Sequence, residues 1–403
     1  MSDMNEYKIV KITDLGTVNR GKSKHRPRND SILYGGEYPF IQTGDVKKAN
    51  LHLVDYTQTY NDVGLKQSKL WKKGTLCFTI AANIADSAIL GMDACFPDSI
   101  VGFLPYENVS DTTYVKYLFD ELKLYFQQIS KGTTQDNLSL DKICRVKLRV
   151  PDYDTQVKVA SILSTYDNLI ENNNKRIRLL EQMAENLYKE WFVRFRFPGY
   201  EDVEFEGGIP KGWKVERLKK YGRVETGKTP STEVADNYGE DYLFIKTPDM
   251  RGNIWVIDTV ERLSQKGHST QKKKKLPKGS IMVSCIGTGG VVAINSKEGH
   301  TNQQINSIIL DDSNNREWLY MLCVGLKTTI EMFGATGSTM TNLSKGKFEN
   351  LKIIEPPYEM RKKYHELTYD IFAEVEKLMY VNDNLIKQRD YLLPRLMSGK
   401  LEV

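Results

Sequence analysis

Apolar residues recur at steps of three and four along the chain after Pro151, and polar or charged residues fill the positions between them. The members of this stripe are Ile162, Tyr166, Leu169, Ile177, Leu180, Ala184, Leu187 and Trp191. A stripe this narrow is typical of a coiled-coil seam, because a helix packed on its own domain shows a wider apolar face. The pattern predicts a helix of about 40 residues, which at about 1.5 Å per residue spans about 60 Å.

A second stripe of the same kind follows Pro356 and Pro357. Its members are Ile371, Val375, Leu378, Ile386, Leu393 and Leu396. Two interpretations are open: either each helix packs on its own domain, or the two helices pair antiparallel and hold two globular domains apart. The second interpretation is favoured because a core helix rarely exceeds about 20 residues.

The two stripes superimpose at an offset of 209 residues, and this offset places both Asn173 and Asn382 on the seam. A buried polar residue on a seam fixes register and partner choice at some cost in stability. Arg389 is the one clear mismatch, since it aligns with Leu180. Pro394, near the end of the second helix, is expected to kink or fray it.

The regions that precede the two helices also repeat. Five blocks of similar sequence occur in the same order in both halves of the chain, at offsets of 204 to 206 residues. The blocks pair residues 7–16 with 213–222, 40–46 with 244–250, 74–80 with 279–285, 132–139 with 337–344, and 150–153 with 355–358. Chance does not explain five ordered matches at so constant an offset. The unit is too long for a solenoid repeat, so it indicates a duplicated pair of globular domain and long helix.

The duplication predicts four segments along the chain. They are a first globular domain over residues 1–150, a first long helix over 151–197, a linker and second globular domain over 198–355, and a second long helix over 356–403. Short β-type runs alternate with turns, at residues 75–80, 281–286 and 291–294. One helix is predicted near residues 113–128 and its counterpart near 317–332. The expected fold class is therefore α/β, of the mixed α+β kind, with an internal pseudo-two-fold repeat.

Composition adds limits rather than a function. The 403 residues include 57 Lys and Arg against 52 Asp and Glu, and the formal charge of +5 is too weak to indicate a polyanionic partner. The 5 cysteines are widely spaced, odd in number and form no CxxC pair, which argues against a disulfide framework or a zinc site. No run approaches the roughly 18 apolar residues of a membrane span, and no signal peptide begins the sequence. A soluble, unexported, cytoplasmic protein is expected.

Two segments match the GxxxxGK[ST] pattern of a phosphate-binding loop in full. They are G-T-V-N-R-G-K-S at residues 16–23 and G-R-V-E-T-G-K-T at residues 222–229. A phosphate loop requires a helix that begins at the Lys, so that the helix N-terminus faces the phosphates. Both lysines instead lead into segments rich in Pro and polar residues. The pattern therefore favours one loop position in a duplicated domain, and a duplicated P-loop ATPase is the alternative.

Two further patterns point towards methyl transfer or cofactor binding, and neither fits. E-P-P-Y at residues 355–358 is similar to the tetrapeptide of DNA amino-methyltransferases, but Glu replaces the Asn or Asp and no G-x-G strand-loop-helix precedes it. G-T-G-G at residues 287–290 precedes a β-type run, so a tight strand connection is expected. The 5 histidines are scattered. No catalytic set, metal site or cofactor site is predicted.

Basic loops are the remaining signal. Residues 20–28 hold five Lys or Arg in nine positions, and residues 272–275 are four consecutive lysines. Such clusters supply phosphate contacts to a duplex, although a solvated charge run is the plain alternative. Nearby loops carry Asn, Gln, Arg and Lys, which can pair with base edges in the major groove.

The candidate DNA contacts fall in both halves of the chain. In the first half they are Arg20, Lys22, Lys24, Arg26, Arg28, Gln42, Thr43, Asn83, Thr133, Thr134, Gln135 and Asn137. In the second half they are Lys228, Lys246, Arg251, Lys272, Lys273, Lys274, Lys275, Gln303, Gln304, Thr339 and Asn342. The loop side chains differ between the halves while the framework blocks match, as expected of two related domains that read different targets.

The order of domain, long helix, domain, long helix resembles the specificity (S) subunits of type I restriction-modification systems, over essentially the whole chain. Supporting motifs are Y-P-F-I-Q-T-G-D-V at residues 38–46, G-T-T-Q-D-N-L-S at 132–139 and G-K-T-P-S-T at 227–232. The most specific motifs are L-L-E-Q-M-A-E-N-L-Y-K-E-W-F at residues 179–192 and R-D-Y-L-L-P-R-L-M-S-G at 389–399.

The resemblance implies two target recognition domains, each reading one half of a split DNA sequence, with the helical pair as a ruler for the unread spacer. It also implies two adenine-N6 methyltransferase subunits docked on the helices and restriction subunits that complete the nuclease. The chain itself would be non-catalytic and hold no cofactor, and S-adenosylmethionine, magnesium and ATP would act only in partner subunits. A coiled-coil scaffold that pairs proteins without a DNA role is a third hypothesis.

Overall fold

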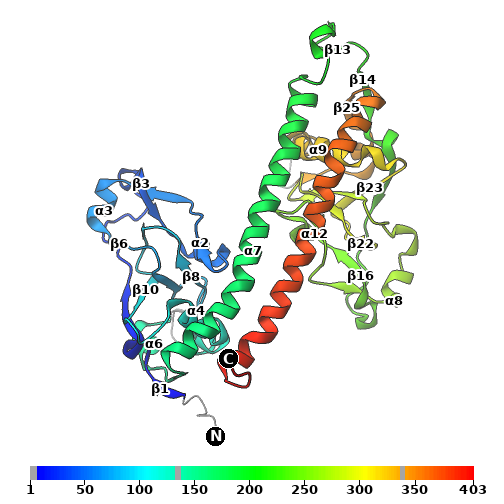
Figure 1. The fold of residues 1–403 in the computed structure, drawn as a ribbon. Coiled ribbons are helices and arrows are strands. Elements are labelled where there is room, and N and C mark those ends of the chain that lie inside the picture. The colour runs from blue at the N-terminus through cyan, green and yellow to red at the C-terminus, as the bar shows by residue number, and fades with distance from the viewer. Residues whose placement is uncertain (1–6, 132–137, 336–340) are drawn as a thin grey trace. The chain divides into compact units, whose positions relative to one another are not determined.

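Figure 1 shows the fold in a computed structural model, which describes residues 7–131, 138–335 and 341–403. The chain divides into two units. Unit 1 consists of Met1–Asn172 together with Asn382–Val403, and unit 2 consists of Asn173–Val381. Each unit therefore combines a globular α/β domain with a segment of both long helices.

Unit 1 contains a five-stranded sheet in the order β2-β10-β7-β8-β4. Its strands are β2 (Gly16–Arg20), β4 (His52–Leu53), β7 (Leu76–Thr79), β8 (Ser87–Leu90) and β10 (Ile100–Pro105). All neighbours are antiparallel except β4 and β8. A second sheet, in the order β5-β3-β9-β6, contains β3 (Tyr34–Phe40), β5 (Gln58–Tyr60), β6 (Leu70–Trp71) and β9 (Ala94–Cys95). A separate ribbon pairs β1 (Lys8–Val10) with β11 (Leu148–Val150).

Unit 2 repeats this topology. Its five-stranded sheet has the order β15-β23-β19-β21-β17, and again only the last pair is parallel. The strands are β15 (Gly222–Thr226), β17 (Trp255–Val256), β19 (Ile281–Ser284), β21 (Val292–Asn295) and β23 (Ile305–Leu310). The remaining strands are β12 (Phe205–Glu206), β13 (Ile209–Pro210), β14 (Lys214–Arg217), β16 (Tyr238–Ile245), β18 (Arg262–Leu263), β20 (Ile286–Gly287), β22 (Gly299–Thr301), β24 (Thr341–Asn342) and β25 (Lys352–Glu355). The predicted internal repeat and mixed α/β fold are confirmed.

The second sheet of unit 2 follows its counterpart closely. Its order is β18-β16-β22, with β16 and β22 parallel as β3 and β9 are in unit 1. An isolated β-bridge between Leu276 and Gly299 is the counterpart in unit 2 of the β6–β9 pairing in unit 1. Two further ribbons pair β14 with β25 and β20 with β24. The duplication therefore extends to strand order and direction, beyond the sequence blocks that revealed it.

Short helices cover the sheets in both units. The α-helices are α1 (Ile12–Leu15), α2 (Thr43–Lys48), α3 (Asp62–Gln67), α4 (Thr112–Glu121), α5 (Lys123–Ser130), α6 (Leu140–Arg145), α8 (Gln265–Ser269), α9 (Arg316–Gly325), α10 (Lys327–Gly334) and α11 (Lys345–Glu349). The 3-10 turns are η1 (Ser31–Leu33), η3 (Tyr200–Asp202), η4 (Leu218–Tyr221), η5 (Ala235–Asn237), η6 (Thr247–Met250), η7 (Lys272–Lys274) and η8 (Ser313–Asn315).

The single helix predicted in each domain is in fact two. Leu122 separates α4 from α5 with φ −87° and ψ 4°, and Leu326 separates α9 from α10 with φ −81° and ψ 2°. The apolar period continues through both breaks, so the sequence pattern did not reveal them. Beyond the breaks, Phe126 and Ile330 are completely buried. The same interruption at the equivalent residue is a further mark of the duplication.

Two long helices, α7 (Tyr153–Tyr188) and α12 (Tyr358–Met397), contain 36 and 40 residues. α7 continues through one π-helical turn, η2 (Lys189–Val193). In unit 1 the early part of α7 shares a hydrophobic cluster with the end of α12, and in unit 2 the late part of α7 shares one with the beginning of α12. The pairing is therefore antiparallel, as predicted. The expected interruption at Pro394 does not end α12, since a proline in the last turn removes only one ladder hydrogen bond.

The buried face of α7 in unit 1 lies one residue away from the predicted seam. Leu163 and Ile170 are buried, whereas Leu169, which was expected on the seam, is 46% exposed. Asp167 occupies the buried position between them. Because Asp167 is charged, a pattern of apolar residues does not include it. The predicted stripe therefore runs through the neighbouring, half-buried Tyr166 instead.

The other seam residues lie mostly on or beside the buried face. Those that are buried are Ala184, Trp191, Val375, Leu378 and Leu396, and those that are half-buried against a hydrophobic cluster are Ile162, Ile177, Leu180, Leu187, Ile371 and Leu393. Asn173 and Asn382 are each 7% exposed. Ile386 is 38% exposed and its placement on the seam was wrong, because the buried face passes through Asn382 and the largely buried Arg389 instead.

Arg389 departs from the apolar stripe because it is the partner of Asp167. Its guanidinium forms an ion pair with the carboxylate, whose side chain is 0% exposed. The Tyr117 hydroxyl donates to the other carboxylate oxygen at 2.5 Å. Burial, reinforced by the Asp167 charge, raises the pKa of the Tyr117 phenol, so this hydroxyl keeps its proton and remains the donor. A polar contact thus joins α7, α12 and α4 within unit 1.

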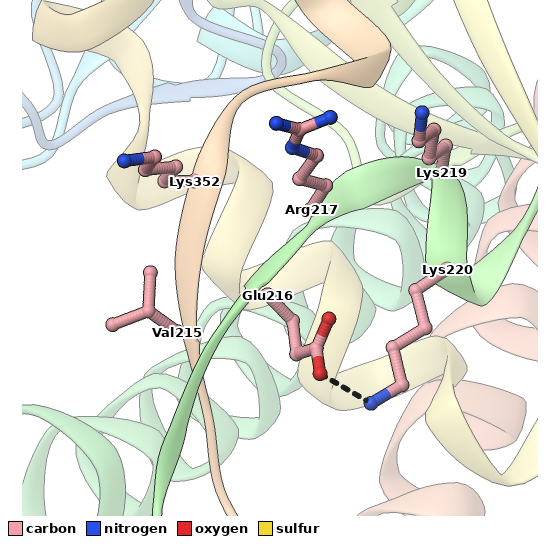
Figure 2. A pocket seen from close by; sticks show the side chains of 6 residues that line it. All are labelled: Val215, Glu216, Arg217, Lys219, Lys220 and Lys352. Atoms are coloured by element: carbon pink, nitrogen blue, oxygen red, sulfur yellow. Dashed lines mark ion pairs between the residues drawn. The ribbon is translucent and has the colours of Figure 1, made fainter.

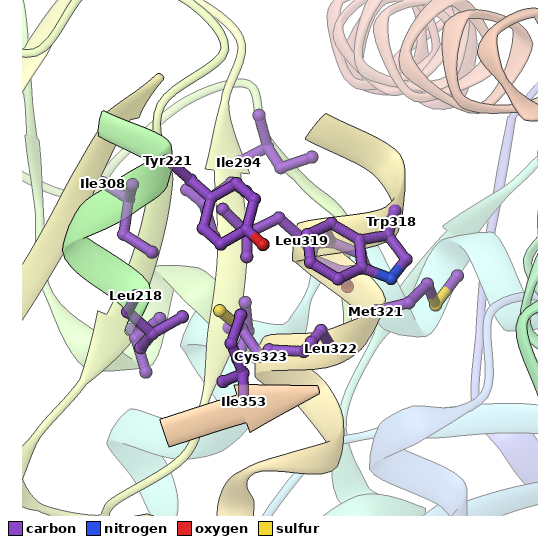
Figure 3. Packing of buried hydrophobic residues seen from close by; sticks show 14 of the residues in the cluster. Leu218, Tyr221, Ile294, Ile308, Trp318, Leu319, Met321, Leu322, Cys323 and Ile353 are labelled. Carbon is purple, nitrogen blue, oxygen red and sulfur yellow. The ribbon is translucent and has the colours of Figure 1, made fainter. Parts of the chain in front are cut away.

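The hydrophobic core of unit 2 runs from the sheet into the long helices. Figure 3 shows Tyr221 of η4 and Ile308 of β23 packed with Trp318 and Leu319 of α9. The same cluster includes aromatic residues of η2 and α12, and the Trp255 indole N–H donates to the Phe372 carbonyl at 2.9 Å. Burying this apolar surface stabilises the fold by about 25 cal/mol for each Å² removed from water. The globular domain and the helices therefore share one core and fold together.

Replacement of Arg389 by Leu is expected to lower the free energy of unfolding by about 3–5 kcal/mol, because Asp167 would remain buried without its partner charge. The double variant Arg389→Leu with Asp167→Asn removes both charges and keeps an acceptor for Tyr117. It should recover most of the loss. Urea unfolding of the full chain, followed by circular dichroism, measures both. A double variant no more stable than the single one would show that the arginine does not act through this pair.

Candidate nucleic-acid interface

The first five residues of each phosphate-loop match form a strand. Gly16 begins β2, which pairs with β10, and Gly222 begins β15, which pairs with β23. A Cβ at Gly16 would lie 2.2 Å from the Leu104 carbonyl oxygen, and one at Gly222 would lie 2.1 Å from that of Ile309. The glycines therefore permit close strand pairing. Among the described residues no helix begins at either lysine of the motif, so the ATPase interpretation was wrong.

Most of the candidate DNA contacts lie at one end of the five-stranded sheet in each unit. The antiparallel register brings together the end of β2, the start of β10 and the loop between β7 and β8. In unit 2 it brings together the end of β15, the start of β23 and the loop between β19 and β21. Segments distant in sequence thus form one loop surface on each domain.

The lysine of the GK pair has the same place in both units. The Lys22 amide donates to the Phe96 carbonyl at 3.0 Å, and the Lys228 amide donates to the Thr301 carbonyl at 3.0 Å. Thr301 is the last residue of β22, and Phe96 directly follows β9. β22 and β9 occupy equivalent positions in their sheets. The repeated motif therefore marks the same structural position in both domains. At this position the chain leaves its strand and enters the loop surface that carries the candidate DNA contacts.

The basic segment of residues 20–28 follows β2 across the end of α3. The Lys24 amide donates to Gln67 at 2.6 Å, which holds the backbone in place. Arg28 donates to both carboxylate oxygens of Asp98 at 2.8 Å, so its charge is already neutralised. The other cations of the segment pair with no carboxylate among the described residues, and they are Arg20, Lys22, Lys24 and Arg26. Four of the five predicted cations therefore remain available to a phosphate.

The lysine run of residues 272–275 is divided in the same way. Lys274 lies 3.0 Å from a carboxylate oxygen of Glu225, and Lys275 lies 2.8 Å from one of Glu298. Lys272 and Lys273 are exposed, and in the part of the chain that the structure describes neither has a carboxylate partner. Only these two lysines present an uncompensated charge.

The remaining candidates of unit 2 surround the entry at Lys228. The Thr229 hydroxyl donates to Gln303 at 2.6 Å. Gln304 follows in the same turn before β23, and its carbonyl accepts from the Cys285 amide at 2.8 Å. Asn342 lies on β24, which pairs with β20. The fold places these residues around one loop entry, whereas the Lys246 ammonium is held by Glu261.

In unit 1, Thr43 begins α2 and Gln42 directly precedes it, and the Gln42 side chain donates to Gln58 at 3.0 Å. Asn83 lies in the loop between β7 and β8. Thr133, Thr134, Gln135, Asn137 and Thr339 lie outside the described residues.

Two side chains of this surface were missed by sequence reasoning. The Lys47 ammonium donates to the Asn83 side chain at 3.3 Å, and the Arg251 guanidinium donates to the Thr288 hydroxyl at 3.3 Å. Asn83 and Arg251 were candidates, but Lys47 and Thr288 were not. The signal was present in the repeat itself, since an offset of 204 residues takes Lys47 to Arg251 and one of 205 takes Asn83 to Thr288.

The segments that suggested enzyme chemistry have structural roles. Glu355, the first residue of E-P-P-Y, ends β25 and pairs with Lys220 at 2.6 Å and with Arg361 at 3.2 Å. Gly287 and Gly290 have φ values of 78° and 76° in a tight connection between strands. Within residues 7–131, 138–335 and 341–403, no group of three or more His, Cys, Asp or Glu is placed to hold a metal ion. No helix in these ranges is long and apolar enough to cross a bilayer.

The sequence pattern of the family described as "Type I restriction modification DNA specificity domain" matches the chain twice, over residues 4–182 and 210–377. The chain belongs to this family. Each match covers one globular domain and much of the long helix that follows it. The two specificity domains are thus the two copies of the repeat.

Relatives match along the whole chain. The HindI specificity subunit of a type I restriction enzyme from Haemophilus influenzae is 30% identical over 472 residues, which cover 100% of both chains. The MjaIX specificity subunit from Methanocaldococcus jannaschii is 28% identical and covers 99% of this chain and 94% of its own. A crystal structure of a type I S subunit from M. genitalium has a TM-score of 0.62 at 12% identity, over 98% of this chain and 97% of that one. This last likeness concerns the fold.

The second specificity domain also has a basic hollow that sequence reasoning missed. Figure 2 shows its lining, which comes from β14, η4 and β25 and consists of Val215, Glu216, Arg217, Lys219, Lys220 and Lys352. The hollow measures about 710 Å³. The hydrogen bonds that Lys220 donates to Glu355 and Glu216 raise the pKa of its ammonium and hold it as a cation. Its cations come from segments more than 100 residues apart, so no local charge run announced the hollow.

Two buried histidines lie beneath the lysine run of the same specificity domain. His300 is completely buried, and its Nε2 lies 2.9 Å from Nδ1 of His268. Burial, together with repulsion from His268 and Lys275, lowers the pKa of His300 to about 4. Burial and the charges of Lys275 and Lys272 also lower the pKa of His268, against a smaller opposing effect of Glu298. Both rings are therefore neutral at pH 7.

Lowering the pH from 7 to 5 is expected to reduce the free energy of unfolding by about 2 kcal/mol through His300. Its pKa is about 4 in the folded protein and near 6.5 in the unfolded chain, so between these values the unfolded state binds the proton. The stability is present above pH 6.5 and is lost as the pH falls towards 4. Urea unfolding at both pH values should show a smaller loss in His300→Asn. Equal losses in the two proteins would contradict the assignment.

Proposed function

We propose that this chain is the DNA sequence-specificity subunit of a type I restriction-modification complex. Its two specificity domains, within residues 1–150 and 198–355, each read one half of a bipartite target. The observation that carries the proposal is the pair of domains with one topology and different side chains on the same loop surface. A shared frame lets both domains meet a duplex in the same way, and different side chains let each select its own sequence.

The long helices act as the ruler between the half-sites. A helix has a fixed rise of about 1.5 Å per residue, so α7 with its 36 residues and α12 with its 40 set lengths of about 54 and 60 Å. Each specificity domain shares its core with both helices. The spacer between the half-sites is therefore a property of the helices, separate from base reading.

The phosphate contacts come from cations that are not already neutralised. These are Arg20, Lys22, Lys24, Arg26, Lys228, Lys272 and Lys273. Cations held by carboxylates are weaker candidates, because a phosphate must displace an existing partner, and they are Arg28, Lys246, Lys274 and Lys275. Base contacts are proposed for Gln42, Thr43, Asn83, Arg251, Gln303, Gln304 and Asn342, and for the candidates outside the described residues.

The chain itself is non-catalytic in this proposal, and its partners are two adenine-N6 methyltransferase subunits and restriction subunits. These partners hold S-adenosylmethionine, magnesium and ATP. Exposed apolar side chains on the long helices support docking there, since Leu179 is 61% and Met183 is 59% exposed one turn apart on α7. Apolar side chains grouped on a surface are typical of a protein interface.

A genome-wide map of N6-methyladenine, made in the source cell with this gene intact and with it deleted, tests the function. Deletion should remove one split, asymmetric methylated motif, because the two half-sites are read by different domains. Co-expression with the neighbouring methyltransferase in a host without that motif should create it. If neither experiment changes the map, the chain is not a specificity subunit and the scaffold hypothesis is favoured.

Replacement of Lys272 and Lys273 by Ala is expected to weaken DNA binding by the assembled complex. The dependence of log affinity on log salt should become shallower by about 2, since each lost phosphate contact removes about 0.9 from the slope. The matched control replaces Lys362 and Lys363, which are also adjacent and exposed but lie on α12. Fluorescence anisotropy with a labelled duplex across a salt series gives both slopes. An equal change in the two variants would indicate a general charge effect rather than contact at the run.

A further inference from the structure

The loop between β7 and β8 and the loop between β19 and β21 have one backbone frame. In unit 2 the Ser284 hydroxyl donates to the Thr288 carbonyl at 2.7 Å and accepts from the Val291 amide at 2.8 Å. In unit 1 the Thr79 hydroxyl donates to the Asn83 carbonyl and accepts from the Asp86 amide at 3.0 Å. The two loops align residue by residue, without insertion or deletion, at an offset of 205. A hydroxyl inside the domain thus braces the tip of each loop.

Both loops adopt left-handed backbone at the same two positions. Gly287 and Gly290 have φ values of 78° and 76°, and their counterparts Ala82 and Ala85 have φ values of 61° and 67°. A residue with a Cβ costs roughly 1–2 kcal/mol in this conformation. Such strain persists only where the surrounding structure demands the conformation, and it is concentrated at functional sites. The first domain therefore keeps this loop shape although it lacks the glycines that would make it easy.

The tip of each loop carries a polar side chain that accepts a hydrogen bond from a cationic side chain. Asn83 accepts from Lys47 at 3.3 Å, and Thr288 accepts from Arg251 at 3.3 Å. Lys47 lies on α2, and Arg251 directly follows η6, the counterpart of α2. Equivalent aspartates cap these turns, each accepting from a backbone amide at 2.8 Å. Frame and placement are thus the same in the two domains, and only the chemistry of the pair differs.

We infer that Lys47–Asn83 and Arg251–Thr288 are equivalent specificity-determining pairs, one for each half-site of the target. This inference rests on the proposed function and names the residues that make its two half-sites different. Lysine with a carboxamide and arginine with a hydroxyl and methyl group offer different donors and acceptors to a base edge. Neither pair is needed to hold its loop, because Thr79 and Ser284 do so. Since each pair is already placed, little ordering entropy is lost when it meets a base.

The test grafts the pair of one domain onto the other. The variant Lys47→Arg with Asn83→Thr gives unit 1 the side chains of unit 2. Its methylation map in the complex should differ from wild type at one or two base positions of one half-site, and the other half-site and the spacer should be unchanged. On duplexes varied at those positions, the preference should shift by about tenfold or more, which is the size of one good base contact.

The reciprocal graft, Arg251→Lys with Thr288→Asn, should change the other half-site only. The matched control is Lys48→Arg, which makes the same chemical change at the neighbouring exposed residue of α2 and should leave the motif intact. Circular dichroism and assembly with the methyltransferase establish that each variant folds. If either graft shows a uniform fall in rate at every sequence, or an unchanged preference at every position, the inference is overturned. If wild type itself methylates no split motif, the proposed function fails instead, and the two failures are distinct.

Discussion

Buried carboxylates that join a globular domain to a long helix are the interaction on which the rest of the structure depends. In unit 1, Asp167 of α7 accepts from Tyr117 of α4 at 2.5 Å. In unit 2, Glu317 of α9 lies 2.5 Å from His365 of α12. Both carboxylates are 0% exposed. A buried charge that loses its partners costs several kcal/mol, so a helix that slid or rotated against its domain would be penalised far more than by lost apolar contact alone. These contacts therefore fix how each specificity domain is mounted on the helical pair.

The mounting continues through the sheet to the loops that we propose to read bases. In unit 1, Glu171 of α7 accepts from the backbone of His52 on β4 at 2.7 Å. In unit 2, Trp255 on β17 donates to the Phe372 carbonyl of α12 at 2.9 Å. β4 and β17 are equivalent strands, and each pairs with the strand that leaves the loop at Asn83 or Thr288. A short path of hydrogen bonds thus links a long helix to the strand that follows the loop tip in both units.

The sequence predicts the architecture correctly because duplication and helical periodicity appear as patterns over many residues. It failed where a structural role contradicts the residue type. Asp167 sits on a buried face that an apolar search cannot follow, so the seam shifted by one residue, and Arg389 looked like an error when it is the partner. At Leu122 the apolar period of the sequence continues although the helix is interrupted between α4 and α5. The phosphate-loop pattern was misleading because close strand pairing requires the same glycines.

The candidate site shows the same division. Charge runs were visible in the sequence, but their ion pairs were not, since Asp98 lies 70 residues from Arg28 and Glu225 lies far from Lys274. Lys47 was overlooked because a lone lysine on a short helix has no distinguishing pattern. Only the fold shows that Lys47 contacts Asn83 and that Arg251 contacts Thr288. The repeat then shows that the two pairs are equivalent.

Unit 1 is built from two separate stretches of chain, and this has a consequence for how the protein is made. Its core includes Leu396 and Met397 beside residues of the first domain, and the Tyr7 hydroxyl donates to the Leu396 carbonyl at 3.4 Å. Unit 2 is a single continuous stretch. On the ribosome, residues 173–381 can therefore complete their fold while the first domain still waits for the end of α12. The domain that is translated first is the one that can be finished only after the other.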